Sequence, residues 1–217
     1  MSNILIIGGT GYAGNHIAKE ATRRGHEVVV LSRSAPQTSL EDVQYVQGSA
    51  LDLTVRTRLL DGADIVVLTV SPRGDMAGKV RQLYHDIATE AAERNVRLVI
   101  VGGFSSLRPA PGKPRFFESG NVPEEYLAEA VEIAGVFDDL KRDFTDNLRW
   151  VFISPAAVFG AYAEVDDYGT PRVGSDVAIF DESGESKISG ADFAVGVVNE
   201  IENSGHDKEN ISFVHQK

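Results

Sequence analysis

The chain has 217 residues and a formal net charge of −11, and this acidic balance argues against nucleic acid or an anionic membrane surface as a partner. It contains no cysteine, which excludes disulfides, thiolate catalysis and cysteine-ligated metal centres. No apolar run is long enough to cross a bilayer and no basic segment precedes the first one, so we expect a cytoplasmic protein of one domain.

The first feature in chain order is an apolar run, Ile4 to Ile7, that leads directly into a glycine-rich turn and a helical pattern. Glycines in such a turn let the backbone approach a pyrophosphate closely, and the free amides at the start of the next helix attract the anion. The helical pattern stops at Gly25, and Val28 to Leu31 reads as a second buried strand, which completes a βαβ unit within about thirty residues. A flexible turn without a ligand is the alternative, but it would not need three glycines in register. The turn therefore predicts a dinucleotide site that includes Gly8, Thr10, Gly11, Tyr12, Ala13 and Gly14.

The residues after the second strand indicate which dinucleotide binds, because they meet the adenosine ribose. A site for NAD(H) places Asp or Glu here, whereas this chain has Ser32, Arg33 and Ser34 and no acid before Glu41. An arginine flanked by hydroxyls suits a 2′-phosphate by charge and by hydrogen bonding, so we expect NADP(H) to be favoured over NAD(H). The alternative interpretation of Arg33 is a solvated loop arginine.

Strands and helices then alternate to the end of the sequence. Apolar runs predict strands at 43–46, 65–70, 98–101, 150–153 and 211–214, and apolar stripes at helical spacing predict helices at 80–91, 126–144 and 193–201. Such alternation predicts an α/β fold with a Rossmann-type, doubly wound and mainly parallel sheet flanked by helices. We expect a single domain over residues 1–217, with a small substrate-side portion formed by segments at about 104–122 and 155–190.

Ligands of such sheets bind beyond the carboxyl ends of the strands, so the residues that follow each strand are candidate site residues. Asp52 follows the third strand, where it could accept a hydrogen bond from the adenine amino group. It could equally begin the next helix and be stabilised by the helix dipole, and one residue could do both. Further candidates follow the fourth, fifth and sixth strands, at Thr69 to Ser71, Gly102 to Ser106 and Ser154 to Phe159.

Taken together, these segments resemble an atypical short-chain dehydrogenase/reductase. More narrowly, they resemble the NmrA-like NAD(P)H-binding proteins described as NADH-flavin reductases, which are also similar to biliverdin reductase B. The resemblance covers nearly the whole chain and is most specific at 101–107, 154–159 and 188–194. It implies that the glycine turn holds the pyrophosphate, that Arg33 approaches the ribose phosphate, and that the segment around Pro155 lies along the nicotinamide. It adds these cofactor-binding residues: Asp52, Leu53, Thr69, Val70, Ser71, Gly103, Phe104, Pro155, Ala156, Ala157 and Val158.

Catalysis by this chain is expected to need little acid or base from the protein. The wider superfamily pairs a tyrosine with a lysine four residues later, which lowers the tyrosine pKa and lets the hydroxyl pass a proton to the substrate. None of the six tyrosines here has such a lysine, and Tyr126, which stands in roughly the right helix, has Ala130 at that position. Because an unassisted tyrosine keeps a pKa of about 10, we do not expect Tyr126 to donate a proton; it could instead belong to the apolar face of its helix.

Hydride transfer to a flavin or a quinone-like acceptor remains feasible, because such acceptors need chiefly stacking, orientation and exclusion of water. Ser105 or Ser106 is the candidate hydroxyl near the nicotinamide, as the superfamily's catalytic serine also lies just beyond the fifth strand; either could instead cap a loop. Segment 107–121, rich in proline and glycine, reads as a mobile loop over the site. Four aromatic residues could line the acceptor site or lie in the core: Phe104, Phe116, Phe117 and Phe159.

The remaining expectations concern partners and alternative functions. The histidines and the acids of segment 160–186 show no metal-ligand spacing, so no metal is expected. The expected partner is a small-molecule electron acceptor, and the chain is expected to act as a monomer or a homodimer. The alternative function is that of a redox sensor, which resembles the NmrA regulator in binding a dinucleotide and reporting its state to a protein. An isomerase or lyase has less support, because a carbon-acid reaction would want a strong base.

Overall fold

Eight strands form one sheet in the computed structural model, which describes residues 1–216 of the chain. Their order is β3-β2-β1-β4-β5-β6-β8-β7, and every neighbouring pair is parallel except β7 with β8. The strand bounds are β1 Asn3–Ile7, β2 Glu27–Ser32, β3 Val43–Gln47, β4 Ile65–Leu68, β5 Arg97–Val101, β6 Trp150–Pro155, β7 Arg172–Gly174 and β8 Glu209–Val214.

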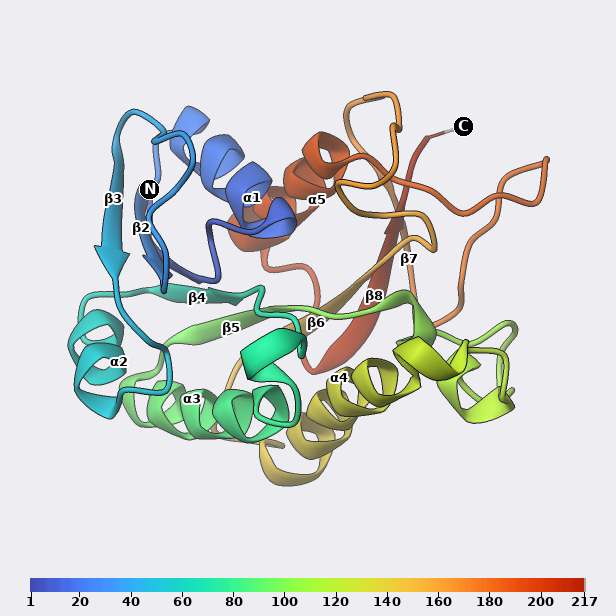
Figure 1. Cartoon of the computed structure of the whole chain (residues 1–217), viewed down its shortest axis with the longest axis horizontal. Coiled ribbons are helices and arrows are strands. Elements are labelled where there is room, and N and C mark those ends of the chain that lie inside the picture. The colour runs from blue at the N-terminus through green and yellow to red at the C-terminus, as the bar shows by residue number, and fades with distance from the viewer. Residues whose placement is uncertain (217) are drawn as a thin grey trace.

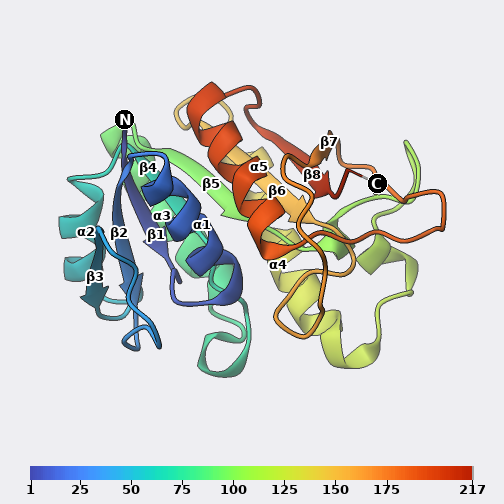
Figure 2. The same cartoon turned by 90° about the horizontal axis from the view of Figure 1, so that it is seen from above.

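Helices cover both faces of this sheet, with α1 and α5 side by side on one face and α2, α3 and α4 on the other (Figures 1 and 2). The helix bounds are α1 Tyr12–Arg23, α2 Leu53–Leu60, α3 Val80–Arg94, α4 Glu124–Asp143 and α5 Gly190–Asn203, with short 3₁₀ turns η1 Gly74–Met76, η2 Phe104–Ser106 and η3 Phe116–Ser119. None of the helices in this described part of the chain has the length and apolar character that a bilayer crossing requires. The strand order changes direction between β1 and β4, which confirms the predicted Rossmann-type doubly wound sheet.

The core consists of two apolar layers, one on each face of the sheet. Successive side chains of a strand point to opposite faces, so Leu5 of β1 packs in the layer with α3 and α4, and Ile6 packs in the layer with α1 and α5. Both side chains are almost fully buried. This burial on both faces explains why the central strands read as continuous apolar runs rather than as alternating patterns.

Two strands differ from the sequence-based expectation. The strand predicted at 65–70 ends at Leu68, because the backbone of Val70 turns to the hydroxyl of Tyr84, which accepts from the Val70 amide at 2.7 Å and donates to its carbonyl at 3.1 Å. Burial raises the pKa of that Tyr84 hydroxyl far above its ordinary value. The short edge strand β7 was not predicted, since its three residues carry no apolar pattern.

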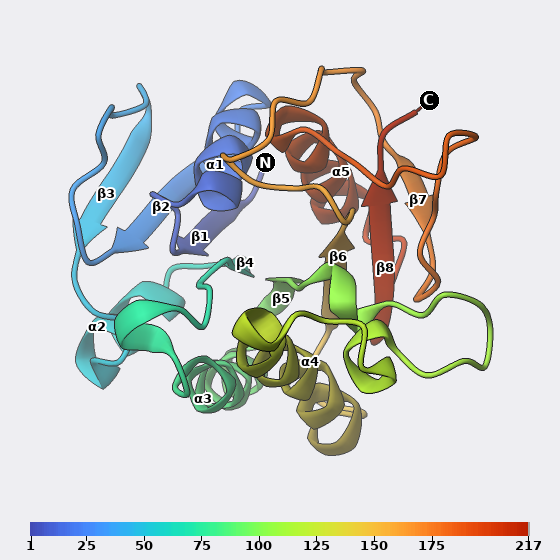
Figure 3. The same cartoon turned by 45° about the vertical axis from the view of Figure 1, so that its right-hand side comes forward.

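The segments that follow β5 and β6 lie together at the β8 and β7 end of the sheet (Figure 3). Arg108 and Val177 form a parallel bridge between the two segments, and the guanidinium of Arg108 lies 3.0 Å from the carboxylate of Asp176. The segments predicted to form the substrate side are therefore in mutual contact beyond the ends of their strands.

A buried ion pair joins the start of β5 to the end of α5. Arg97 donates to the Glu200 carboxylate at 2.5 Å and to the Glu200 carbonyl at 2.9 Å, and the two side chains are only 3% and 5% exposed. We expect Arg97→Ala to lower the free energy of unfolding by about 3–5 kcal/mol, because it removes the guanidinium from a buried carboxylate that would keep only its contacts with His206. Denaturant titration measures this change.

Arg94→Ala is the matched control, since Arg94 bonds at 2.8 Å to Asp61, a carboxylate whose side chain is 62% exposed. Exposed pairs contribute at most about 1 kcal/mol, so this variant should stay close to the wild-type protein. Equal losses in the free energy of unfolding of both variants would show that the buried pair stabilises the fold no more than the exposed pair.

Candidate functional site

Of the three glycines in register in the turn after β1, Gly8, Gly11 and Gly14, one faces open space and two are required by the turn itself. Gly8 has a φ of +88°, and a Cβ on it would lie 2.8 Å from the Thr69 hydroxyl oxygen. A Cβ on Gly14 would lie 2.6 Å from the Gly9 Cα atom, so this residue lets α1 begin tightly against the turn. Gly11 has an ordinary φ of −74°, and a Cβ on it would meet only the Gly8 carbonyl oxygen, at 3.3 Å. The lack of a side chain at Gly11 therefore leaves space on the open side of the turn, whereas Gly8 and Gly14 avoid contacts within the turn.

Two cavities, of about 720 and about 320 Å³, meet at this turn. They lie beyond the carboxyl ends of β1 and β4, where the strand order changes direction and where ligands of such sheets bind. Five residues line both cavities: Gly11, Thr69, Val70, Ser71 and Arg73. The arrangement suits a long ligand that is bent over the glycine turn, with one half in each cavity.

The smaller cavity collects the residues predicted to contact the adenosine half of a dinucleotide. It is lined by Gly8, Thr10, Leu31, Ser32, Arg33, Ser34, Gly48, Ser49, Ala50 and Met76 together with the shared residues and Ile7. The Arg33 guanidinium lies 3.3 Å from the Asp75 carboxylate, and the two side chains are 53% and 89% exposed. Such an exposed pair is weak, so the guanidinium is free to turn toward an anion.

Asp52 and Leu53 lie outside the lining of both cavities. The Asp52 carboxylate accepts from the backbone amides of Thr54 at 2.9 Å and Val55 at 3.4 Å, which makes it the N-cap of α2. Leu53 is exposed at the first position of that helix. Of the two interpretations of Asp52, the helix cap is the one visible here, and contacts of either residue with a cofactor stay predictions.

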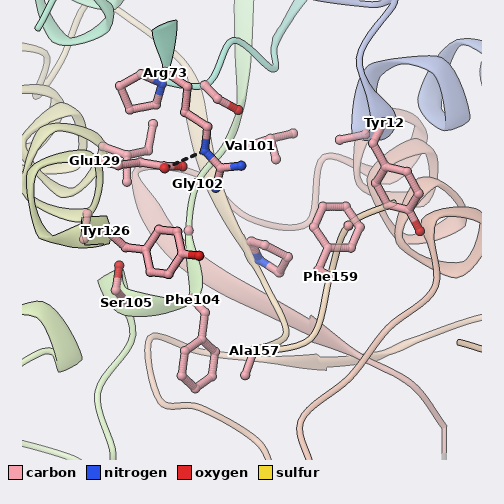
Figure 4. Close-up of a pocket in the computed structure, with 18 of the residues that line it drawn as sticks. Tyr12, Arg73, Val101, Gly102, Phe104, Ser105, Tyr126, Glu129, Ala157 and Phe159 are labelled. Carbon is pink, nitrogen blue, oxygen red and sulfur yellow. Dashed lines mark hydrogen bonds and ion pairs between the residues drawn. The ribbon is translucent and has the colours of Figure 1, made fainter. Parts of the chain in front are cut away.

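The larger cavity brings together most of the residues predicted for the nicotinamide half. Its lining includes Tyr12, Ala13, Gly103, Phe104, Ser105, Pro155, Ala156 and Ala157, several of which are labelled in Figure 4. Gly14, Ser106 and Val158 do not line it. Ser106 is buried, and its hydroxyl has no hydrogen-bond partner within residues 1–216. Of the two candidate serines, Ser105 is thus the one that faces the cavity.

Aromatic rings form much of the cavity wall. Phe104 and Phe116 stack with centroids 4.8 Å apart, and Phe159 packs edge-on against Tyr12 at 5.3 Å. The Tyr12 hydroxyl accepts from the Gly190 amide at 2.9 Å, which fixes its ring against the start of α5. Phe117 lies instead against the guanidinium of Arg115, 4.7 Å from its ring centroid. Three of the four phenylalanines considered from the sequence therefore line the cavity.

The segment expected to be a mobile loop, 107–121, is held at several points. Leu107 is buried, and Arg115 donates to the Asp138 carboxylate of α4 at 2.8 and 2.9 Å and to Glu118 at 3.0 Å. Burial opposes the charge on Arg115, but its bonds to these carboxylates outweigh that effect and raise its pKa. The segment thus forms part of the cavity wall, at Phe116 and Asn121.

Two charged residues of the larger cavity, Arg73 and Glu129, were not predicted from the sequence. Arg73 donates from its Nε to the Glu129 carboxylate at 2.6 Å, and this pair supplies the charged side chains in the lining of the larger cavity (Figure 4). The bond to Glu129 raises the pKa of Arg73, and the hydroxyls of Tyr126 and Tyr162 add to that effect. Tyr126 is 51% exposed and lines the cavity together with Ala130 and Ile133 of the same stripe, so this end of the stripe faces the cavity. The position of Arg73 just after a strand end was the signal that could have found it.

Comparison with known proteins agrees with this geometry. A family model described as NAD(P)H-binding matches residues 8–204. The chain is 32% identical over 215 residues to the uncharacterized protein YwnB of Bacillus subtilis, and the match covers 98% of each chain. Two solved structures are similar over nearly their full length. One, from Streptococcus pneumoniae, is described as a putative NADH-flavin reductase, with 29% identity, 100% of each chain covered and a TM-score of 0.84. The other, from Bacteroides thetaiotaomicron, is described as a putative epimerase, with 28% identity, 99% and 97% of the two chains covered and a TM-score of 0.86.

Proposed function

Because the chain belongs to the NAD(P)H-binding family, we propose that it is a reductase that transfers hydride from NADP(H) to a planar flavin-like or quinone-like acceptor. The observation that carries this proposal is the pair of cavities that meet at Gly11, one lined by Arg33 and its serines and the other by aromatic rings. The description of the Streptococcus pneumoniae relative as a putative NADH-flavin reductase supports the same class of acceptor.

The cofactor preference rests on the smaller cavity. Arg33, Ser32 and Ser34 line it, and no carboxylate is part of its lining in the described chain. A carboxylate would accept hydrogen bonds from the ribose hydroxyls of NAD(H), whereas a guanidinium with two hydroxyls suits the 2′-phosphate of NADP(H). We therefore favour NADP(H) over NAD(H).

The acceptor class rests on the larger cavity. Its volume of about 720 Å³ exceeds what a nicotinamide and its ribose would fill, and Phe104, Phe116, Phe159 and Tyr126 give it flat apolar walls. Such walls orient a planar ring system. A flavin or quinone is planar and accepts hydride readily, so it fits both the shape and the scarcity of acid–base groups.

The residues that line the larger cavity act mainly by orienting the cofactor and the acceptor, and less by transferring protons. When bound, the reduced nicotinamide supplies the hydride, which carries two electrons to the acceptor. The backbone from Pro155 to Ala157 and Gly103 would orient the nicotinamide, and Ser105 is the hydroxyl available beside it. The proton that completes the reduced acceptor comes from water at the open side of the cavity, where Tyr126 is half exposed.

We expect Tyr126→Phe to lower kcat by less than about threefold. Ala130 stands one turn after Tyr126, where a lysine would be needed to assist the hydroxyl, and hydride acceptors of this class need no strong acid. Steady-state rates with a flavin acceptor measure the effect. A loss of about 100-fold or more, the range of general acid catalysis, would make Tyr126 a catalytic residue and overturn this part of the mechanism.

The test of the proposed function is NADPH and NADH oxidation with FMN, riboflavin and a panel of small quinones, alongside calorimetric titration of each nucleotide. The proposal predicts tighter binding of NADPH and saturable turnover with a planar acceptor. Tight nucleotide binding without turnover across the panel would instead favour the redox-sensing alternative and direct the search to a protein partner.

A further inference from the structure

The loop that joins β4 to α3 lies where the two cavities meet. This junction loop, residues 71–79, brings Arg73 into the lining of both cavities and Met76 into that of the smaller one. Lys79, at the N-cap of α3, supplies no side-chain cap to the helix. The first amides of α3 therefore need an acceptor from elsewhere in the fold.

Glu132 of α4 supplies that acceptor. One of its carboxylate oxygens accepts from the Gly78 amide at 2.7 Å, and the other accepts from the amides of Val80 at 2.6 Å and Arg81 at 3.2 Å. A carboxylate at this position gains charge-assisted hydrogen bonds and the favourable end of the helix dipole. A single side chain from the neighbouring helix thus fixes the backbone at the point where the junction loop enters α3.

Helix α4 also reaches the cavities. Tyr126, Glu129 and Glu132 follow one another at intervals of three residues, so each lies beside the next on the helix surface. Tyr126 lines the larger cavity, and Glu129 holds the Nε atom of Arg73 at 2.6 Å. Figure 4 shows the Arg73 guanidinium pointing into the cavity beside Glu129. Three neighbouring side chains of α4 therefore border the acceptor side, hold Arg73 and anchor the loop that carries it.

We propose that Glu132 is a positioning residue for the dinucleotide. By fixing the start of α3 it holds the backbone of the junction loop, and so holds Arg73 where the cavities meet and where the phosphates and the adjoining ribose of a dinucleotide would pass. The inference rests on the proposed function for the identity of the ligand. It assigns to α4 a role in cofactor binding in addition to its place beside the acceptor.

The test is a double-mutant cycle on the dissociation constant for NADPH, measured by calorimetry. Glutamine at position 132 keeps the size of the side chain but loses the charge and turns an NH₂ group toward amide donors, so Glu132→Gln should weaken NADPH binding about tenfold. In the Arg73→Ala background the same substitution should cause no further loss, because its effect passes through Arg73. A role in stability alone would lower the unfolding midpoint equally in both backgrounds and would not depend on Arg73.

Asp139→Asn is the matched control, since it weakens another contact between the same two helices. Arg81 donates to Asp139 at 2.6 and 2.8 Å, and this ion pair lowers the pKa of Asp139. The control should lower the unfolding midpoint and leave the NADPH dissociation constant unchanged. Unchanged binding in Glu132→Gln, or equal weakening with and without Arg73, would overturn the inference. A wild-type protein that binds NADPH but reduces no acceptor would refute the reductase and leave this role of Glu132 standing, whereas one that does not bind NADPH would overturn both.

Discussion

Gly11→Val is expected to weaken binding of both NADPH and NADH by at least about 100-fold, equivalent to about 2.7 kcal/mol. The residue has an ordinary φ and lines both cavities, and an added Cβ would approach only the Gly8 carbonyl oxygen, at 3.3 Å. Valine therefore requires only a small shift at the Gly8 carbonyl, and most of the loss arises because its branches occupy the space in front of the amides that would hold the pyrophosphate. Calorimetric titration with each nucleotide measures the change.

Gly62→Val is the control for this experiment, because a Cβ there would have no atom within 4 Å and no positive φ stands against it. It should leave nucleotide binding unchanged, and thermal unfolding of both variants should show a folded protein. If Gly11→Val kept its affinity, the pyrophosphate would have to bind elsewhere, and the placement of the dinucleotide across the two cavities would be wrong.

Arg33→Ala is expected to have the second large effect. It should lower the affinity for NADPH by about 10- to 100-fold and change the affinity for NADH by less than about twofold. A hydrogen bond to a charged group contributes about 1.5–3 kcal/mol, and only NADPH has the 2′-phosphate that Arg33 would meet. The comparison of the two nucleotides separates this role from a general loss of fold. Calorimetric titration of the same protein preparation with both nucleotides gives the ratio.

Asp75→Asn tests whether the ion pair with Asp75 restrains the Arg33 guanidinium. The guanidinium lies 3.3 Å from an Asp75 side chain that is 89% exposed, so releasing it should leave NADPH binding unchanged or slightly tighter. Equal weakening of NADPH and NADH by Arg33→Ala would contradict a 2′-phosphate contact, and no effect on either would return Arg33 to a solvated loop arginine.

The parts of the fold that could be predicted are those whose residues form a recognisable pattern within a short stretch of the sequence. Ile4 to Ile7, the glycine turn and the second strand follow each other within one βαβ unit, so spacing and turn chemistry were enough to place them. Most of the residues that the same pattern predicted for the site line one of the two cavities, because the carboxyl ends of parallel strands meet at one edge of the sheet.

The parts that could not be predicted depend on contacts between distant segments. Arg73 and Glu129 are 56 residues apart, and Glu132 caps a helix that begins 52 residues before it, so no window of sequence contains either contact. Tyr126 was considered for the apolar face of its helix because periodicity alone cannot tell a side chain that faces a cavity from one that faces the core. Asp52 matched two patterns at once, that of an adenine contact and that of a helix N-cap. The hydrogen bonds that its carboxylate accepts from the amides of Thr54 and Val55 show the N-cap.

Hydride transfer from NADPH to a planar acceptor held in the larger cavity can be measured in an anaerobic single-turnover experiment. Enzyme in excess is mixed with NADPH and FMN, and the absorbances of the nicotinamide and the flavin are followed together. We expect equal amounts of nicotinamide oxidised and flavin reduced, at a rate that saturates with enzyme concentration, and no such reaction in Gly11→Val. Oxidation of NADPH no faster than in the absence of enzyme, with NADPH demonstrably bound, would contradict this hydride transfer.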